Sequence, residues 1–152
     1  MSPAFTLDIH DGADLPCILF DTNVVLDVFL AREPFLHDSK KAIESMISLK
    51  PRSFIAASSL TDLAYVLQKN LGSAAATHEA LEEVLNLFDI ADTTAWDVYS
   101  AHANKAPDFE DNLIAATADR IGAKYIVTRN VKDFKVLIVK VVTPHEFLKL
   151  LE

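Results

Sequence analysis

Acidic residues stand where several predicted elements of this chain begin or end, and together they could bind a cation. Asp21 follows the apolar run 17–20, Asp62 lies one turn into a predicted helix, and Asp133 follows the apolar run 125–127. Asp108 and Asp111 open another predicted helix, and their spacing of three residues places both on one face. If these carboxylates converge, they repel one another unless a cation neutralises them.

Hard oxygen ligands of this kind favour Mg²⁺ or Mn²⁺ over zinc. Metal ions held by carboxylates keep bound water, which one ion can activate for in-line attack on a phosphodiester bond. A second ion, where present, stabilises the leaving oxygen. The pattern therefore favours metal-dependent phosphodiester hydrolysis.

The acids that lie before residue 112 also have purely structural interpretations. Asp21 could cap the helix that follows it. Asp62 lies three residues after Ser59, the spacing of a capping box. Asp108 could be an N-cap, and Asp111 with its neighbour Glu110 could stabilise the positive end of the helix.

The segment after residue 127 carries the same ambiguity. Asp133 could belong to a turn before Phe134, and Thr128 and Asn130 could cap that segment or orient a ligand. Four other acids lie on predicted helix faces without such placement, and we interpret them as exposed to solvent: Asp27, Asp38, Glu82 and Glu83.

Short apolar runs alternate with helical patterns along the chain, which predicts a parallel sheet with helices on both faces. The predicted strands are 17–21, 54–57, 88–91, 125–128 and 138–142. The predicted helices are 23–31, 39–49, 59–70, 74–88, a helix from residue 94, 108–121 and 145–151. In such a sheet the strand ends after residues 21, 57 and 127 share one edge, where open α/β sheets bind ligands. Residues 1–16 form a polar lead-in, and residues 17–152 form a single domain.

Composition limits the class of protein. The 152 residues suffice for one domain, and 51% apolar with 24% charged residues is typical of a soluble globular protein. No apolar run is long enough to span a membrane, and no secretory signal is visible, so we expect a cytoplasmic protein. Cys17 is the single cysteine, which excludes an intrachain disulfide.

The net charge of −8 argues against a protein that simply coats nucleic acid. Basic residues concentrate from Arg120 onward, where seven stand against three acids. A polyanion could therefore meet the C-terminal section if cations neutralise the acids. The five histidines lack metal-ligand spacing, and neither a glycine-rich phosphate loop nor a Gly-x-Ser-x-Gly elbow is present.

Four segments resemble the PIN domain, of the kind found in VapC-type toxins. They are Asp21-Thr22-Asn23, Asp62 within Thr-Asp-Leu-Ala-Tyr, residues 108–116 (DFEDNLIAA) and residues 127–134 (VTRNVKDF). The resemblance runs from about residue 17 to the end. It implies a compact α/β/α sandwich with a central parallel sheet of about five strands. It also implies a Mg²⁺- or Mn²⁺-dependent endoribonuclease, a homodimer and a cognate antitoxin.

The resemblance assigns roles position by position. Asp21, Asp62, Asp111 and Asp133 would be catalytic, although Asp62 stands where the family more often has glutamate. The implied metal ligands are Asp21, Asp111 and Asp133, with Asp108 as a further ligand. Asn23, Thr128 and Asn130 would support these acids. Candidate contacts to RNA phosphates are Arg129, Lys132 and Lys135.

Two other hypotheses remain open at this point. The shorter Asp62 side chain could leave the site incomplete, which would make the protein an RNA-binding or scaffold module without turnover. A receiver-type phosphorylation switch is also lined with acids at the sheet edge. That class needs a lysine after its last strand, whereas Lys140 lies within the predicted fifth strand.

Overall fold

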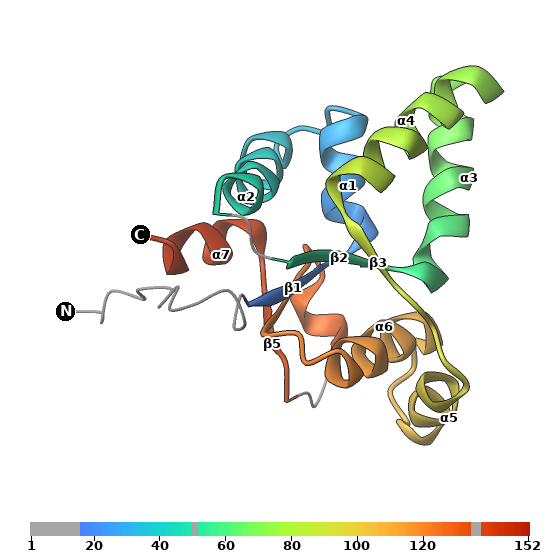
Figure 1. Cartoon of the computed structure of the whole chain (residues 1–152), viewed down its shortest axis with the longest axis vertical. Helices are drawn as coiled ribbons and strands as arrows, with labels where there is room; N and C mark the ends of the chain where they lie inside the picture. Colours follow the sequence, from blue (N-terminus) through green and yellow to red (C-terminus); the bar gives the residue numbers. More distant parts are fainter. Residues whose placement is uncertain (1–15, 50–51, 135–137) are drawn as a thin grey trace.

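A parallel sheet between two layers of helices forms the centre of the computed structural model, which describes residues 16–49, 52–134 and 138–152 (Figure 1). The strands are β1 (Cys17–Phe20), β2 (Arg52–Ala56), β3 (Asp89–Ala91), β4 (Tyr125–Val127) and β5 (Lys140–Val142). Their order is β3-β2-β1-β4-β5, and all four pairings are parallel. The predicted α/β class and its five-stranded parallel sheet are confirmed.

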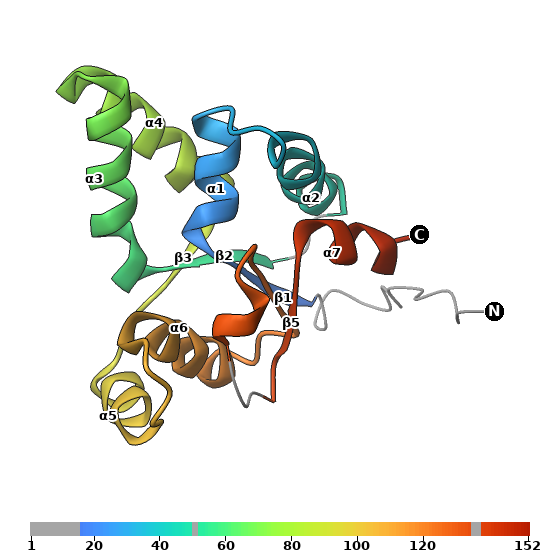
Figure 2. The same cartoon turned by 180° about the vertical axis from the view of Figure 1, so that it is seen from behind.

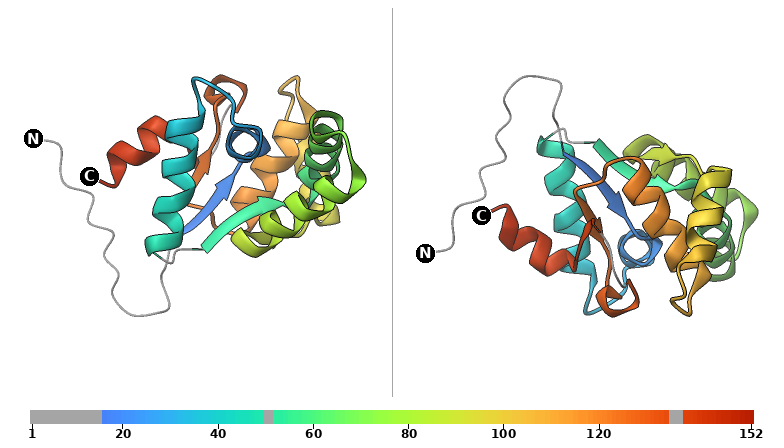
Figure 3. Two further views of the ribbon diagram at one scale, coloured as in Figure 1. Left: turned by 90° about the horizontal axis from the view of Figure 1, so that it is seen from above. Right: turned by 90° about the horizontal axis from the view of Figure 1, so that it is seen from below.

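Alternate residues of β1 face opposite layers, which explains why this strand is apolar throughout. Ile18 and Phe20 pack into one core and Leu19 into the other. The first layer contains α1 (Thr22–Phe29), α2 (Leu36–Leu49), α3 (Leu60–Leu71), α4 (Ala74–Leu87) and α7 (Pro144–Leu150). The second contains α6 (Phe109–Arg120), on which α5 (Ala95–Ala103) packs (Figures 2 and 3).

The strand order places a topological switch point at β1. The chain first moves outward from β1 to β2 and β3, then returns to the other side of β1 for β4 and β5. Connections that leave neighbouring strands in different directions open a crevice at their carboxyl ends. The backbone amide of Asp21 donates to the carbonyl of Val127 at 2.9 Å, so the ends of β1 and β4 meet at this crevice.

The predicted break between the third and fourth helices is confirmed. Gly72 ends α3 with a φ of 71°, a left-handed conformation that costs glycine little. Ser73 then caps α4 by accepting a hydrogen bond from the backbone amide of Ala76 at 3.0 Å. The two helices therefore turn sharply and pack against each other.

Several element boundaries differ from the predictions. α2 begins at Leu36 rather than residue 39, and β5 begins at Lys140 because Ile138 is 96% exposed and pairs with no strand. A short 3₁₀ turn, Ala57–Ser59, precedes α3. The predicted lead-in, 1–16, lies outside the described residues except for Pro16. No helix among the described residues has the length and apolar character needed to cross a membrane.

Candidate active site

Asp21 stands directly after β1 and is held by three donors. Its Oδ1 accepts a hydrogen bond from the backbone amide of Thr22 at 2.8 Å, which makes Asp21 the N-cap of α1. Its Oδ2 accepts from the hydroxyl of Thr128 at 2.7 Å and from the side-chain amide of Asn23 at 3.1 Å. The capping interpretation is therefore confirmed. The carboxylate of Asp21 is also fixed at the switch point of the sheet.

Thr128 and Asn23 connect the ends of β1 and β4. The Asn23 side chain donates to the Thr128 hydroxyl at 3.3 Å and accepts from the backbone amide of Arg129 at 3.2 Å. The Thr128 hydroxyl also accepts from the backbone amide of Asn130 at 3.1 Å. These side chains thus orient Asp21 and the segment after β4 together.

Asp108 and Asp111 lie at the start of α6. The Asp108 carboxylate caps the helix by accepting from the backbone amide of Asp111 at 3.1 Å, as the capping interpretation predicts. Burial raises the pKa of Asp111 to about 7, and the charges of Asp108, Asp21, Asp133 and Glu110 add to this increase. The acids from these separate segments therefore lie within reach of one another's charge.

Asp62 does not form the predicted capping box. Ser59 adopts a helical conformation and makes no side-chain capping bond, because the 3₁₀ turn before α3 already continues into the helix. Asp62 instead lies near Glu110 of α6. Burial and the nearby charges of Asp62, Asp21 and Asp108 raise the pKa of Glu110. Glu110 is a site residue that the sequence analysis interpreted only as a helix-stabilising acid.

A cavity of about 680 Å³ opens beside these groups. Among the residues that line it are Asp108, Glu110, Lys132 and Asp133. Asp133 closes a short 3₁₀ turn, Val131–Asp133, and its backbone amide donates to the carbonyl of Asn130 at 3.0 Å. We call this cavity, with its six neighbouring carboxylates, the acidic cleft: Asp21, Asp62, Asp108, Glu110, Asp111 and Asp133.

The donor atoms of the acidic cleft are of the kind that bind a hard cation, but their positions do not form a complete coordination shell. Its oxygen donors and mutual repulsion match what Mg²⁺ or Mn²⁺ would neutralise. Across residues 16–49, 52–134 and 138–152, however, no three carboxylate, imidazole or thiol groups converge closely enough to hold an ion. Water molecules on the ion, or rotation of the exposed acids, would have to complete its coordination.

Arg129 makes contacts that the sequence did not indicate. Its Nε lies 2.9 Å from Oδ2 of Asp27, and its guanidinium lies 4.0 Å from the centre of the Phe35 ring. The prediction that Asp27 is exposed is wrong, since its side chain is fully buried and also accepts a hydrogen bond from Ser39 at 3.0 Å. The pairing with Arg129 explains why this acid can be buried.

The structure brings together most of the predicted site residues. Asp21, Asn23 and Thr128 form one hydrogen-bonded group, while Asp111 and Asp133 lie within charge reach of it. Lys132 lines the acidic cleft, and the Asn130 backbone joins the network of Thr128. Lys135, a predicted phosphate contact, lies outside the described residues.

Comparisons with known proteins identify the family and the fold of the chain. The family model described as PIN domain matches residues 17–132. The comparison with curated proteins found no significant match. A toxin–antitoxin complex from Klebsiella pneumoniae contains a chain that is 26% identical, with a TM-score of 0.65, and the match covers 84% of this chain and 97% of that one.

Two further solved structures share the fold. A chain of FitAcB from Neisseria gonorrhoeae is 23% identical, with a TM-score of 0.66 and coverage of 84% of this chain and 98% of that one. VapC20 from Mycobacterium tuberculosis, described as a sarcin–ricin loop cleaving toxin, is 18% identical, with a TM-score of 0.57 and coverage of 72% and 86%.

Proposed function

Because this chain belongs to the PIN domain family, we propose that it is a Mg²⁺- or Mn²⁺-dependent endoribonuclease and the toxin of a toxin–antitoxin pair. The observation that carries the proposal is the acidic cleft, where Asp108, Glu110 and Asp133 line one cavity and Asp21, Asp62 and Asp111 lie within reach of their charge. The similarity to a chain of the Klebsiella pneumoniae toxin–antitoxin complex supports the same conclusion.

Within this proposal, Asp21, Asp111 and Asp133 would hold the cation, with Asp108 as a further ligand and Asp62 as a water-mediated one. The bound cation would supply an activated water for attack on the phosphodiester bond. Thr128 and Asn23 hold Asp21 in one orientation, so the ion would meet a fixed carboxylate.

Positive charge beside the cleft would position the RNA backbone. Lys132 lines the cavity and would contact a phosphate without reading the base. Arg129, another predicted phosphate contact, is paired with the buried Asp27, so we assign the phosphate contact at the cleft to Lys132. We place the reaction in the cytoplasm, where RNA substrates are abundant.

The decisive test compares three variants of the full chain on RNA substrates with Mg²⁺ or Mn²⁺. Asp21→Asn and Asp111→Asn should each lower the cleavage rate by about 100-fold or more, because each removes a charge that the reaction needs. Glu82→Gln on the exposed face of α4 is the control and should cleave like the unmodified chain. Full activity in both aspartate variants would exclude the acidic cleft as the active site.

A metal titration separates the nuclease from a non-catalytic PIN module. Calorimetry with Mn²⁺ should detect binding to the unmodified chain and much weaker binding to Asp21→Asn. If the unmodified chain binds RNA but neither binds Mn²⁺ nor cleaves at any metal concentration, the shortened Asp62 has left a module without turnover.

We also propose a homodimer and an antitoxin partner. Tyr65 of α3 and Leu85 of α4 are 67% and 55% exposed, so the α3–α4 pair presents apolar surface to a second chain. Sedimentation of the chain alone, and after co-expression with the product of the adjacent gene, should reveal a dimer and a larger complex. A monomer in both samples would reject both partners.

A further inference from the structure

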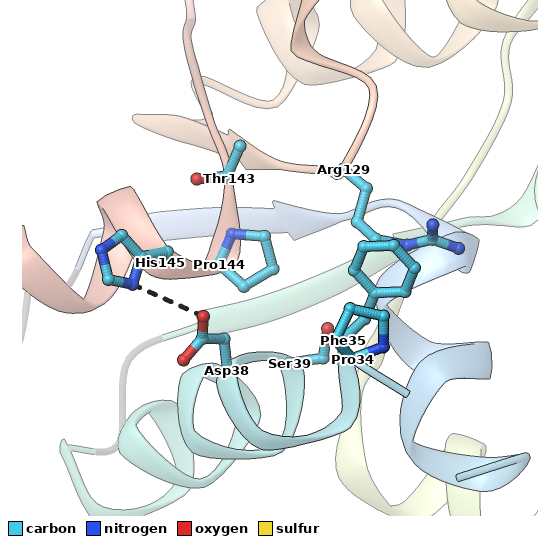
Figure 4. A pocket seen from close by; sticks show the side chains of 8 residues that line it. All are labelled: Pro34, Phe35, Asp38, Ser39, Arg129, Thr143, Pro144 and His145. Carbon is cyan, nitrogen blue, oxygen red and sulfur yellow. Dashed lines mark ion pairs between the residues drawn. The ribbon is translucent and has the colours of Figure 1, made fainter. Parts of the chain in front are cut away.

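A second cavity lies at the same edge of the sheet as the acidic cleft. Its volume is about 260 Å³, and its lining includes Pro34, Phe35, Asp38, Pro144 and His145. Arg129 also lines it, and for that reason we call it the Arg129 pocket (Figure 4). It is separate from the acidic cleft, since the two linings share no residue.

A rigid connection joins the Arg129 pocket to the candidate active site. Arg129 directly follows Thr128, whose hydroxyl donates to Asp21, and the Arg129 backbone amide donates to Asn23 at 3.2 Å. From there the Arg129 side chain is held by the buried carboxylate of Asp27 at 2.9 Å. The wall of the pocket is therefore fixed relative to the first acid of the cleft.

The walls of the pocket suit a flat ring. Phe35 and Pro34 form one side, and Pro144 lies opposite beside His145 and Asp38 (Figure 4). The Arg129 guanidinium lies against the Phe35 ring at 4.0 Å, which holds that ring in place. Proteins that recognise RNA bind unstacked bases between such aromatic and apolar groups.

The polar groups of the pocket favour a base over a phosphate. The Asp38 carboxylate is half-buried, and its Oδ2 lies 3.4 Å from Nδ1 of His145. A carboxylate repels phosphate but accepts two hydrogen bonds from adjacent N–H donors. Asp27 already neutralises the nearby guanidinium of Arg129, so little positive charge remains to attract an anion.

We propose that the Arg129 pocket binds the guanine base of an RNA nucleotide next to the phosphate in the acidic cleft. Among the four common bases, guanine presents two adjacent N–H donors, N1–H and the N2 amino group, and so matches both oxygens of Asp38. The proposal rests on the proposed ribonuclease function, since the cleft must hold an RNA strand for its base to reach the pocket.

Nucleoside monophosphates test the pocket without requiring cleavage. Calorimetric titration of the full chain should show that guanosine monophosphate binds about tenfold more tightly than the adenosine, cytidine and uridine monophosphates. The protein should likewise bind guanosine, which lacks the phosphate, more tightly than the other three nucleosides, because the preference depends on the base. Equal binding of all four monophosphates, or no binding at all, would overturn the proposal.

Two variants locate the preference in the pocket. Asp38→Asn should bring the four affinities within about twofold of one another, and Phe35→Ala should weaken all of them. Glu82→Gln is the matched control and should bind like the unmodified chain, while thermal melting verifies that each variant is folded. A guanine preference that survives in Asp38→Asn contradicts the assignment.

Cleavage mapping keeps this proposal distinct from the nuclease itself. RNA cleavage by the unmodified chain, with cut positions that do not shift in Asp38→Asn, would reject the pocket and leave the nuclease intact. Guanosine monophosphate binding without RNA cleavage would reject the nuclease and retain a guanine site. If a protein partner protects the Phe35 amide from hydrogen exchange while no mononucleotide binds, the pocket belongs to that partner.

Discussion

Asp62 and Glu110 come from different helices, yet their carboxyl groups lie within reach of each other's charge at the acidic cleft. Burial and the nearby charges of Asp62, Asp21 and Asp108 raise the pKa of Glu110, so its negative charge is disfavoured there. We expect this repulsion to lower the stability of the protein when no cation is bound.

Glu110→Gln should raise the stability of the metal-free protein and reduce the stabilisation that Mg²⁺ provides. In EDTA the variant should gain about 0.5 kcal/mol in free energy of unfolding, because a repulsive charge has been removed. Adding Mg²⁺ should stabilise the variant less than it stabilises the unmodified chain, because the bound ion has lost one neighbouring negative charge. Chemical denaturation under both conditions measures the difference. Identical Mg²⁺ effects in the two proteins would place Glu110 outside the cation site.

Single residues also show what the sequence could and could not predict. Asp108 caps the helix that directly follows it, so the neighbouring sequence was enough to predict this role. The burial of Asp27 depends on Arg129, 102 positions later, and the contact between Asp62 and Glu110 depends on how α3 meets α6. Local spacing contains no information about such long-range contacts.

Among the elements, α5 and α6 are joined by an ion-paired group far from the cleft. Asp97 of α5 is fully buried, and its Oδ1 lies 2.9 Å from Nε of Arg120 on α6. Arg120 also donates to the backbone carbonyl of Asp92 at 2.6 Å. Burial alone would raise the pKa of Asp97, but the hydrogen bonds from Arg120 and Thr94 outweigh it and hold the pKa below its usual value. These contacts hold α5 against the helix that presents Asp108 and Asp111.

Asp97→Asn should lower the free energy of unfolding at neutral pH by about 3 kcal/mol, since it leaves Arg120 without its buried partner. Because folding lowers the pKa of Asp97, its contribution is complete above the unfolded pKa of about 4 and disappears as the pH falls through the folded value. Urea denaturation from pH 7 to pH 2 should show the unmodified chain and the variant converging at the acidic end. A constant difference across that range would contradict this account of the pair.

Element positions were largely predictable because apolar runs and helix caps are local signals. The paired capping residues of α5 and α7, for example, are visible in the sequence as Thr94 with Asp97 and Thr143 with Glu146. Boundaries were less predictable where tertiary contacts decide them. β5 is an edge strand with one neighbour, so its length follows from the pairing with β4 rather than from its own apolar residues.

For the molecule as a whole, the net negative charge limits how strongly the proposed RNA substrate is attracted. The chain carries a net charge of −8, while seven of its 14 basic residues lie from Arg120 onward, in the section that contains Lys132. Long-range attraction for a polyanion is therefore weak, and contacts at the cleft must provide the affinity.

Lys132→Gln should weaken binding of single-stranded RNA about equally for all sequences and reduce the salt slope by about 1, because one phosphate contact is lost. Measurements in the Asp21→Asn background prevent cleavage during the titration. Lys69→Gln on α3 provides a comparable loss of charge outside the cleft and should leave the slope unchanged. A change in sequence preference with an unaltered slope would show that Lys132 does not contact phosphate.

The hydrogen bond between Asp21 and Thr128 spans 107 positions of the chain. During synthesis, the first acid leaves the ribosome long before the residue that orients it. A nascent or truncated chain that ends before β4 therefore lacks both the neighbouring strand and the Thr128 hydroxyl. The proposed nuclease activity would therefore arise only after translation is almost complete.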